Sequence, residues 1–350
     1  MAGNWGFPDF DAHEGVHLFT DPASGLQAVI AIHSTKLGPA AGGVRFWHYA
    51  SSDAAITDAL RLSRGMSFKN AMADLPLGGG KAVVLAEAPG AKIDEARLVA
   101  FGKAVESLCG RYVTAEDVGM SEASMKVIAG QTRHVSGLPV GEGAAGGDPG
   151  PYTARGVYLG VKAAARRALG SDDMKGVRVA IQGVGSVGGG LAKLLARDGA
   201  ELILADVNAA RAEQLAAHLG AKTASADAIL LQDVDIVSPN ALGAILTPGV
   251  IDQLRCKAVA GGANNQLETM AEGQRIHDRG IVYAPDYVIN AGGIINVGLE
   301  YLGQGDEAEV MARIDRIPVR LNQVWDESER SGAPAAQVAD TIAQRLIGRG

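Results

Sequence analysis

The sequence contains few of the residues and segments that mark secreted, metal-binding or membrane proteins. Its two cysteines, Cys109 and Cys256, lie far apart without a metal-type spacing, and we interpret them as reduced, buried thiols. The seven histidines show no metal-ligand spacing either. No run of 18 apolar residues occurs, and the first residues, MAGNWGFPDF, lack a basic region followed by an apolar stretch. We therefore expect a cytoplasmic protein with no metal site and no membrane segment.

Runs of basic residues are absent as well. Lysine and arginine number 32 against 39 acidic residues, so the net charge is −7 and neither nucleic acid nor an anionic membrane is an expected partner. What is present is the composition of a globular protein, with 47% hydrophobic and 20% charged residues over 350 positions. This length suffices for about two domains. Glycine, at 47 residues, is in excess and predicts many tight turns and close backbone approaches.

A glycine- and proline-rich stretch, GEGAAGGDPGP, divides the sequence into two parts. We predict one domain over residues 1–150 and a second over residues 151–330. Strands and helices alternate in the second part, which predicts a parallel sheet with helices on its faces. From Asp306 onward the sequence predicts two helices separated by SGAP, and we expect the last, about 334–350, to pack back on the first domain.

The motif GVGSVG directly follows the predicted strand VRVAIQ and opens a helix, as a dinucleotide-binding loop does. In this interpretation Gly183 makes the tight turn, Gly185 lets the pyrophosphate approach the backbone, and Gly188 lets helix and strand pack closely. Asp206 ends the next strand, where a carboxylate accepts hydrogen bonds from the adenosine ribose and repels a 2′-phosphate. NAD is therefore predicted over NADP. The alternatives are a glycine-rich packing turn and an acid that merely begins a helix.

A second motif, GGGKAVV at 78–84, places Lys81 beside three glycines. It is no Walker phosphate loop, because Ala82 stands where that pattern needs Ser or Thr. Lys69, Lys81 and Asp117 all fall at ends of predicted elements. Two lysines in one cleft lower each other's pKa, so one of them could act as a base beside a carboxylate. Ordinary surface lysines are the alternative.

Ordered blocks along most of the sequence resemble the amino-acid dehydrogenase family, in particular its leucine, valine and phenylalanine branch. The blocks are GPAAGGVRFW, DALRLSRGMSFKNA, LPLGGGKAVV, TAEDVG, YTARGVYLGVKAA, IQGVGSVG, ADVN, ALGAIL, GGANNQL and PDYVINAGGIINV. The resemblance implies an α/β fold of two domains: an N-terminal α/β domain for substrate and oligomerisation, and a C-terminal Rossmann-type domain for NAD, separated by a cleft. It also implies a homo-oligomer, commonly an octamer.

The activity implied by this resemblance is reversible oxidative deamination, in which an L-amino acid, NAD and water give a 2-oxo acid, ammonium and NADH. Carried over to this sequence, Lys81 activates water and Asp117 moves protons to and from the substrate amine, while Lys69 binds the substrate carboxylate. Other positions that the resemblance assigns to the substrate are Gly42, Gly43, Asn264, Ala41, Ala115, Ile294 and Val297. Those that it assigns to the cofactor are Gly183, Gly185, Ser186, Val187, Gly188, Asp206, Val207, Thr153, Ala241 and Asn290.

The side-chain pocket implied in this way is apolar, which disfavours glutamate because its second carboxylate would lack a partner. Ile294 and Val297 are branched and favour leucine, isoleucine or valine, whereas Ala41 replaces an expected leucine and widens the pocket. A phenylalanine or broader aromatic amino-acid dehydrogenase is thus an alternative, and a catalytically silent NAD-binding sensor is a more remote one. Asn240, where the family usually has cysteine, is a further departure.

Overall fold

The computed structural model describes residues 5–138 and 145–349, so positions 141–144 of the expected linker lie outside the described residues. The chain forms two compact units, both of the α/β class that the sequence predicts. Unit 1 comprises 1–147, 295–310 and 343–350, and unit 2 comprises 148–294 and 311–342. The sequence predicts a domain boundary after residue 150, and the two units divide after Gly147.

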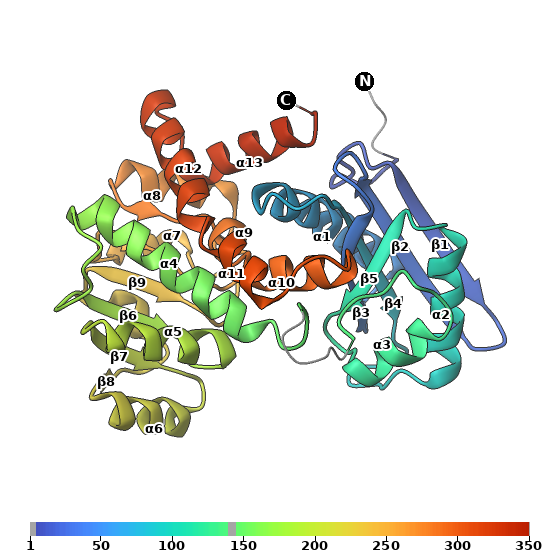
Figure 1. Ribbon diagram of the computed structural model, residues 1–350, viewed down its shortest axis with the longest axis horizontal. Helices are drawn as coiled ribbons and strands as arrows, with labels where there is room; N and C mark the ends of the chain where they lie inside the picture. The colour runs from blue at the N-terminus through green and yellow to red at the C-terminus, as the bar shows by residue number, and fades with distance from the viewer. Residues whose placement is uncertain (1–4, 139–144, 350) are drawn as a thin grey trace. The chain divides into compact units, whose positions relative to one another are not determined.

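Unit 1 is built on a mixed sheet with the strand order β1-β2-β4-β3-β5 (Figure 1). Strand β2 runs antiparallel to β1 and β4, whereas β3 runs parallel to both β4 and β5. This order places β3 between β4 and β5, although β3 comes first in the chain. The strands are β1 (Gly15–Asp21), β2 (Leu26–Ser34), β3 (Ala40–Trp47), β4 (Gly78–Leu85) and β5 (Tyr112–Glu116).

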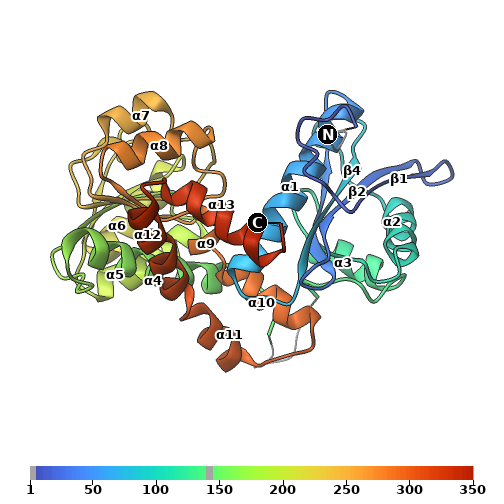
Figure 2. The ribbon, with the colours of Figure 1, turned by 90° about the horizontal axis from the view of Figure 1, so that it is seen from above.

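The two faces of this sheet carry separate apolar cores because successive side chains of a strand alternate between faces. Helix α1 (Ser52–Met72) covers one face, where its Leu60 packs with Val29 and Val83. Helices α2 (Glu95–Ser107) and α3 (Glu122–Ala129) cover the other, where Phe101 and Ile128 lie among the alternate strand residues. Figure 2 shows the helices on either side of the sheet.

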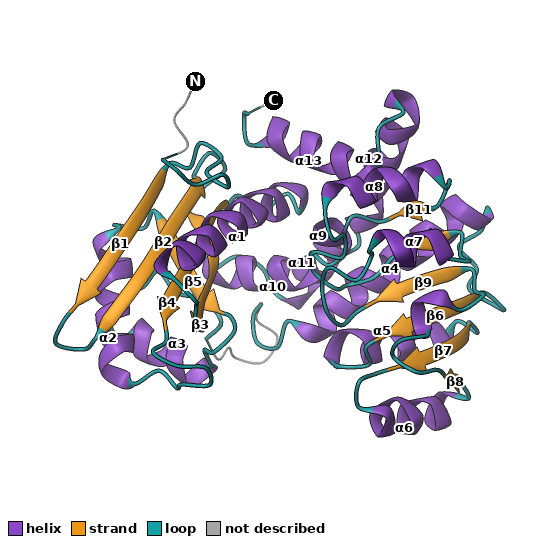
Figure 3. Ribbon diagram, turned by 180° about the vertical axis from the view of Figure 1, so that it is seen from behind, coloured by secondary structure: helices purple, strands orange, loops and turns teal. Residues whose placement is uncertain are grey.

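Unit 2 contains a parallel sheet with the order β11-β10-β9-β6-β7-β8. Figure 3 labels β11, β9, β6, β7 and β8 of this sheet. With the six strands numbered 1 to 6 along the chain from β6, and the sheet taken from β8 to β11, this is the Rossmann order 3-2-1-4-5-6. The strand order reverses between β6 and β9, which themselves run parallel. In such sheets the ligand lies beyond the carboxyl ends of the strands at the reversal. The strands are β6 (Arg178–Gln182), β7 (Glu201–Ala205), β8 (Lys222–Thr223), β9 (Ile236–Pro239), β10 (Ala258–Val259) and β11 (Val282–Tyr283).

Helices cover both faces of this sheet, as the crossovers of parallel strands require. In Figure 2 helices α7 and α8 lie on one side, and α4 and α5 lie on the other. The helices between the strands and before the C-terminal region are α4 (Gly150–Leu169), α5 (Ser186–Arg197), α6 (Ala209–Leu219), the 3-10 helix η1 (Ile229–Leu231), α7 (Pro248–Gln253), α8 (Met270–Asp278) and α9 (Asp286–Ile289). Helix α10 (Gly292–Tyr301) follows, with its first three residues in unit 2 and the rest in unit 1.

The C-terminal region differs from the prediction of two helices. Before the SGAP segment the structure has two helices, α11 (Glu307–Ile314) and α12 (Ile317–Ser331). Pro318 lies in the first turn of α12, where its missing N–H costs nothing, so the break precedes it.

The last helix, α13 (Ala335–Leu346), also differs in part from the expectation that it packs on the first domain. Residues 335–342 belong to unit 2, because Ala336 joins an apolar core there and Asp340 accepts a hydrogen bond from Tyr287. Only residues 343–350 belong to unit 1.

Candidate active site

The glycines before Lys81 let other parts of unit 1 approach β4 closely. A Cβ on Gly79 would overlap the backbone of Ser67 in α1, and one on Gly80 would stand 2.7 Å from the ring of Tyr112. The space that the glycines clear is thus filled by a helix and by a buried tyrosine, whose hydroxyl donates to the carbonyl of Gly42 over 2.6 Å. The motif therefore fixes the packing around Lys81.

The amine of Lys81 meets the carboxylate of Asp117. Lys81 Nζ donates a hydrogen bond to Asp117 Oδ2, and the side chains are 8% and 23% exposed. Asp117 immediately follows β5, and a Cβ on Gly43 of the neighbouring strand would come within 2.9 Å of its Cβ. The sequence-predicted catalytic residues, 36 positions apart, are thus brought into direct contact.

Burial and charge act on this pair in opposite ways. Burial lowers the pKa of Lys81 by disfavouring the ammonium, and this outweighs the raising effect of Asp117. Burial alone would raise the pKa of Asp117, but the positive charges of Lys81 and Arg45 hold it below its usual value. The site therefore favours an ionised carboxylate next to an amine that loses its proton more readily than a surface lysine does.

The remaining substrate positions of unit 1 lie on the same strands or on the adjacent helix. Ala41 is buried on β3 beside Gly42 and Gly43, and Ala115 on β5 pairs in register with Gly43. Lys69 is half-buried in the last turn of α1. Its neighbour Asn70 donates to the carbonyl of Gly78 over 2.6 Å, so this turn lies on the start of β4.

Two of the predicted substrate positions, Val297 and Ile294, are half-buried in α10 but fall in different units. Val297 belongs to unit 1 with Lys81. Ile294 belongs to unit 2, as does Asn264.

The glycine-rich loop of unit 2 joins β6 to α5 as the motif predicts. Gly183 has a φ of +82°, a left-handed conformation that favours glycine. Gly185 is the N-cap of α5, and apart from its chain neighbours no heavy atom of the described residues lies within 4 Å of an added Cβ. A Cβ on Gly188 would overlap the carbonyl of Gly183. Ser186 and Val187 begin the helix, so their amides lie at its positive end.

Asp206 supports this loop from the end of β7. Its Oδ2 accepts a hydrogen bond from the Val184 N–H and its Oδ1 accepts one from the Asn208 N–H, each over 2.9 Å. Burial opposes ionisation, but these hydrogen bonds hold the pKa of the carboxyl below its usual value. Val207 next to it is 90% exposed, and Ala241 faces Gly183 from the loop after β9.

A set of asparagines lies beyond the ends of β9 and β10. Asn290 Nδ2 donates to Asn264 Oδ1 over 2.8 Å and to the Gly262 carbonyl over 3.1 Å. The Asn290 Oδ1 is buried and has no hydrogen-bond partner among the residues that the structure describes, which suits an incoming donor such as a carboxamide. Thr153 lies in the first turn of α4, where its hydroxyl donates to the Pro149 carbonyl over 2.9 Å.

Asn240, the departure from the expected cysteine, has a clear structural role. Its Oδ1 accepts a hydrogen bond from the Gly262 N–H over 2.9 Å, and its Nδ2 donates to the Ser238 carbonyl over 3.0 Å. The amide therefore joins the ends of β9 and β10, a role that a cysteine could not fill with both a donor and an acceptor of this strength.

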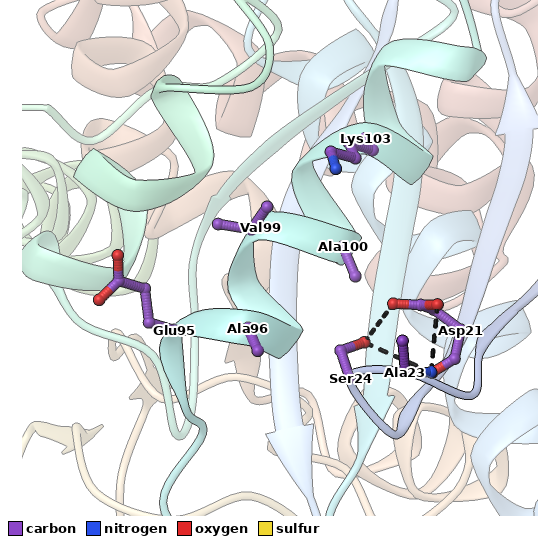
Figure 4. Close-up of a pocket in the computed structure, with 8 residues that line it drawn as sticks. All are labelled: Asp21, Ala23, Ser24, Glu95, Ala96, Val99, Ala100 and Lys103. Carbon is purple, nitrogen blue, oxygen red and sulfur yellow. Dashed lines mark hydrogen bonds between the residues drawn. The ribbon is translucent and has the colours of Figure 1, made fainter.

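A surface pocket of unit 1 contains none of the predicted site residues (Figure 4). It lies between the β1–β2 turn and α2, where Ser24 donates a hydrogen bond to Asp21 over 2.6 Å. It is lined by Asp21, Ala23, Ser24, Glu95, Ala96, Val99, Ala100 and Lys103. Across residues 5–138 and 145–349, no cluster of three or more His, Cys, Asp and Glu side chains could hold a metal ion. Within the same ranges no helix is long and apolar enough to cross a membrane.

The fold and these sites define a class of two-unit α/β proteins with a dinucleotide-type loop in one unit and a buried lysine–aspartate pair in the other. A family described as "Glu/Leu/Phe/Val dehydrogenase, dimerisation domain" matches residues 13–134. The description "Glutamate/Leucine/Phenylalanine/Valine dehydrogenase" matches residues 204–347. The chain belongs to this family of amino-acid dehydrogenases, which are oxidoreductases.

Several amino-acid dehydrogenases are similar to this chain over nearly its full length. A leucine dehydrogenase of Bacillus subtilis is 46% identical over 96% of this chain and 92% of its own. A valine dehydrogenase of Streptomyces virginiae is 43% identical over 97% of this chain and 95% of its own. The solved structure of an L-tryptophan dehydrogenase from Nostoc punctiforme is 37% identical with a TM-score of 0.86, and covers 96% of both chains.

Proposed function

We propose that the protein catalyses the reversible, NAD-dependent oxidative deamination of an apolar L-amino acid, with leucine and other branched-chain amino acids preferred. An L-amino acid, NAD⁺ and water give a 2-oxo acid, ammonium, NADH and a proton. The observation that carries this proposal is the buried pair of Lys81 and Asp117 in a member of the amino-acid dehydrogenase family. Such a pair supplies both a base and a proton carrier beside a reacting carbon.

Each charged residue has one role in the proposed reaction. Lys69 binds the substrate carboxylate as a cation, which orients the α-carbon. Lys81, whose pKa burial lowers, takes a proton from the water that attacks the imine carbon. Asp117 accepts a proton from the substrate nitrogen when the amine is oxidised to the imine. It returns a proton to that nitrogen after water has added, so that ammonia can leave.

The loop of unit 2 fits a dinucleotide. The amides at the start of α5 are suited to the pyrophosphate. The Asn290 Oδ1, which lacks a hydrogen-bond partner in the described part of the chain, is suited to a carboxamide N–H. The Asp206 carboxylate favours NAD over NADP, because a 2′-phosphate near it would meet a negative charge. When bound, NAD supplies the acceptor for the hydride from the α-carbon.

The apolar positions Ala41, Ala115, Ile294 and Val297 support an aliphatic substrate. They offer no partner for a second carboxylate, so glutamate is disfavoured. Similarity to leucine and valine dehydrogenases favours branched side chains. A second candidate is an aromatic amino acid, which the small side chain of Ala41 and the similarity to a tryptophan dehydrogenase support.

A substrate panel tests the proposal. Leucine, isoleucine, valine, phenylalanine, tryptophan and glutamate are each supplied with NAD, and NADH absorbance is followed. We expect the highest kcat/KM for a branched-chain substrate and none for glutamate. NADH binding without turnover of any of these amino acids or their 2-oxo acids would instead indicate the catalytically silent sensor.

The Lys81→Ala variant tests the catalytic assignment. It should lose nearly all turnover, because no other amine is proposed to activate water, and it should still bind NADH in a fluorescence titration. An unchanged kcat in this variant would show that Lys81 has no catalytic role.

A homo-oligomer and a cytoplasmic location belong to the same proposal. The family description of residues 13–134 as a dimerisation domain supports assembly through unit 1. Light scattering after size-exclusion chromatography measures the number of protomers, and cell fractionation tests the location.

A further inference from the structure

We propose that Arg45 is a positioning residue of this reaction, which holds the Asp117 carboxylate ionised and in place when Lys81 is neutral. The inference rests on the proposed function, since it takes Lys81 and Asp117 as the reacting pair.

The sheet register places Arg45 on the strand that lies between the strand of Lys81 and the strand that ends at Asp117. In the register between β3 and β4, Arg45 pairs with Val83, two residues from Lys81, so Arg45 and Lys81 share a face of the sheet. In the register between β3 and β5, Val44 pairs with Glu116, and Asp117 is the next residue. Arg45 on β3 therefore lies on the same face of the sheet as Lys81 on β4 and next to Asp117 at the end of β5.

The contacts of the guanidinium agree with this placement. Arg45 Nε lies 3.4 Å from Asp117 Oδ2, and Arg45 Nη1 donates to Asp58 Oδ2 over 2.9 Å. Asp58 belongs to α1, and the same oxygen accepts a hydrogen bond from the Tyr49 hydroxyl over 2.5 Å. Tyr49 thus fixes the Asp58 carboxylate, and Asp58 in turn fixes the Arg45 guanidinium.

The Nε–H of Arg45 is still available to donate a hydrogen bond. This nitrogen is buried and makes no hydrogen bond within residues 5–138 and 145–349, since its approach to Asp117 falls outside hydrogen-bond geometry. The Asp117 oxygen that it faces is the one that accepts from Lys81 Nζ. When the Lys81 amine hydrogen-bonds to the attacking water, Asp117 Oδ2 loses the donor that Lys81 supplied. A small movement of Arg45 then lets its Nε–H donate to that oxygen instead.

The charges of the cluster explain why this replacement matters. A carboxylate with low exposure needs a compensating charge, or it takes up a proton and can no longer accept one from the substrate. Arg45 stays cationic throughout, because a guanidinium does not lose its proton in proteins. Burial is the largest cause of the lowered pKa of Lys81, and the charge of Arg45 lowers this pKa further. The charge of Asp58 raises it. Tyr112, buried on β5 beside Asp117, stays neutral because burial raises its pKa.

Two substitutions of opposite charge effect test the proposal. The measurement is the pH profile of kcat/KM for oxidative deamination, whose acidic limb reports the free enzyme's base. Arg45→Met removes the positive charge and should move this limb by about one pH unit to higher pH. Asp58→Asn removes a negative charge and should move it to lower pH. Ionisation of the substrate amine contributes equally in every variant, so differences between profiles come from the protein.

Three further variants separate this role from a merely structural one. Arg45→Lys retains the charge and should restore the wild-type position of the limb, even if kcat falls. Arg97→Met is the matched control. Arg97 lies in α2, on the other face of the sheet, and pairs with Glu87, so the pH profile of this variant should match that of the wild type. Lys81→Ala is measured in parallel, since turnover in that variant contradicts the proposed function rather than the role of Arg45.

The expected result is a pair of shifts of opposite sign in variants that still bind NADH. No shift in either variant, or shifts in the same direction, with Lys81→Ala inactive, would overturn the role of Arg45 alone. If Arg45→Met does not fold, the sign of the shift in Asp58→Asn decides the question.

Discussion

Acid should destabilise unit 1 through His33, a residue that the proposed chemistry does not use. This histidine lies on β2 and is fully buried, with Nδ1 2.8 Å from Ser67 Oγ and Nε2 2.7 Å from Arg349 Nη1. A guanidinium can only donate, so the closer partner of Nε2 is Arg349, from which it accepts, and the ring is neutral. The Asp11 Oδ2 lies farther from the same Nε2, at 3.3 Å. Arg349 also donates to the backbone carbonyls of Asp11 and Ala12, so His33 forms part of the attachment of the C-terminus to the N-terminal segment.

The pKa of His33 sets the size of the effect. Burial, followed by the charges of Arg349 and His13, outweighs the raising effect of the Asp11 carboxylate and lowers this pKa from 6.5 to about 3. Below pH 6.5 the unfolded chain therefore binds a proton that the folded chain does not. The contribution to stability is complete above pH 6.5 and is lost progressively as the pH falls toward about 3. Between pH 7.5 and 5.5 the loss amounts to about 1.4 kcal/mol of the free energy of unfolding.

Urea denaturation of the wild type and of His33→Gln at both pH values measures this loss. Glutamine can accept from Arg349 and donate to Ser67 but does not titrate in this range, so other groups, including His13, cancel in the comparison. We expect the wild type to lose about 1.4 kcal/mol more than the variant over this interval. The protomer concentration must be the same throughout because assembly contributes to stability. An equal loss in both proteins would refute the reasoning.

The remaining predictions concern cofactor and substrate choice. Asp206→Asn removes the charge near the adenosine ribose, so the preference for NAD over NADP in kcat/KM should fall by about tenfold, or about 1.4 kcal/mol. If the ratio of the two kcat/KM values is unchanged, the carboxylate does not discriminate between them. Ala41→Leu adds volume to the proposed side-chain pocket and should lower kcat/KM for phenylalanine and tryptophan more than for valine. An equal effect on all three substrates would place Ala41 outside that pocket.

Local patterns explain why much of the fold could be predicted. The alternation of strands and helices after residue 151 requires a parallel sheet, and GVGSVG between a strand and a helix specifies a loop whose atoms are close in sequence. The sequence predicts Asp206 as a ribose ligand but not its two hydrogen bonds to the backbone of Val184 and Asn208. They depend on the distance between the ends of β6 and β7, which no local pattern contains.

Arg45 shows what local reasoning could not reach. In the sequence it is an arginine in a strand, and such residues usually face solvent. Its contacts with Asp117 and Asp58 follow from the strand order β4-β3-β5, together with the helix that covers that face. With that order known, the alternation of side chains would have been a sufficient signal.

By itself the sequence determined the α/β class, the glycine-rich loop and the residue types available for chemistry, because these depend on periodicity and on neighbours along the chain. Only the tertiary structure decided which charges meet. Lys81 reaches Asp117 over 36 positions, and Arg349 reaches His33 over 316, because strands and chain ends distant in sequence lie side by side. Electrostatic interactions fall off with distance in space and not along the chain, so pKa values and charge networks become defined only on folding.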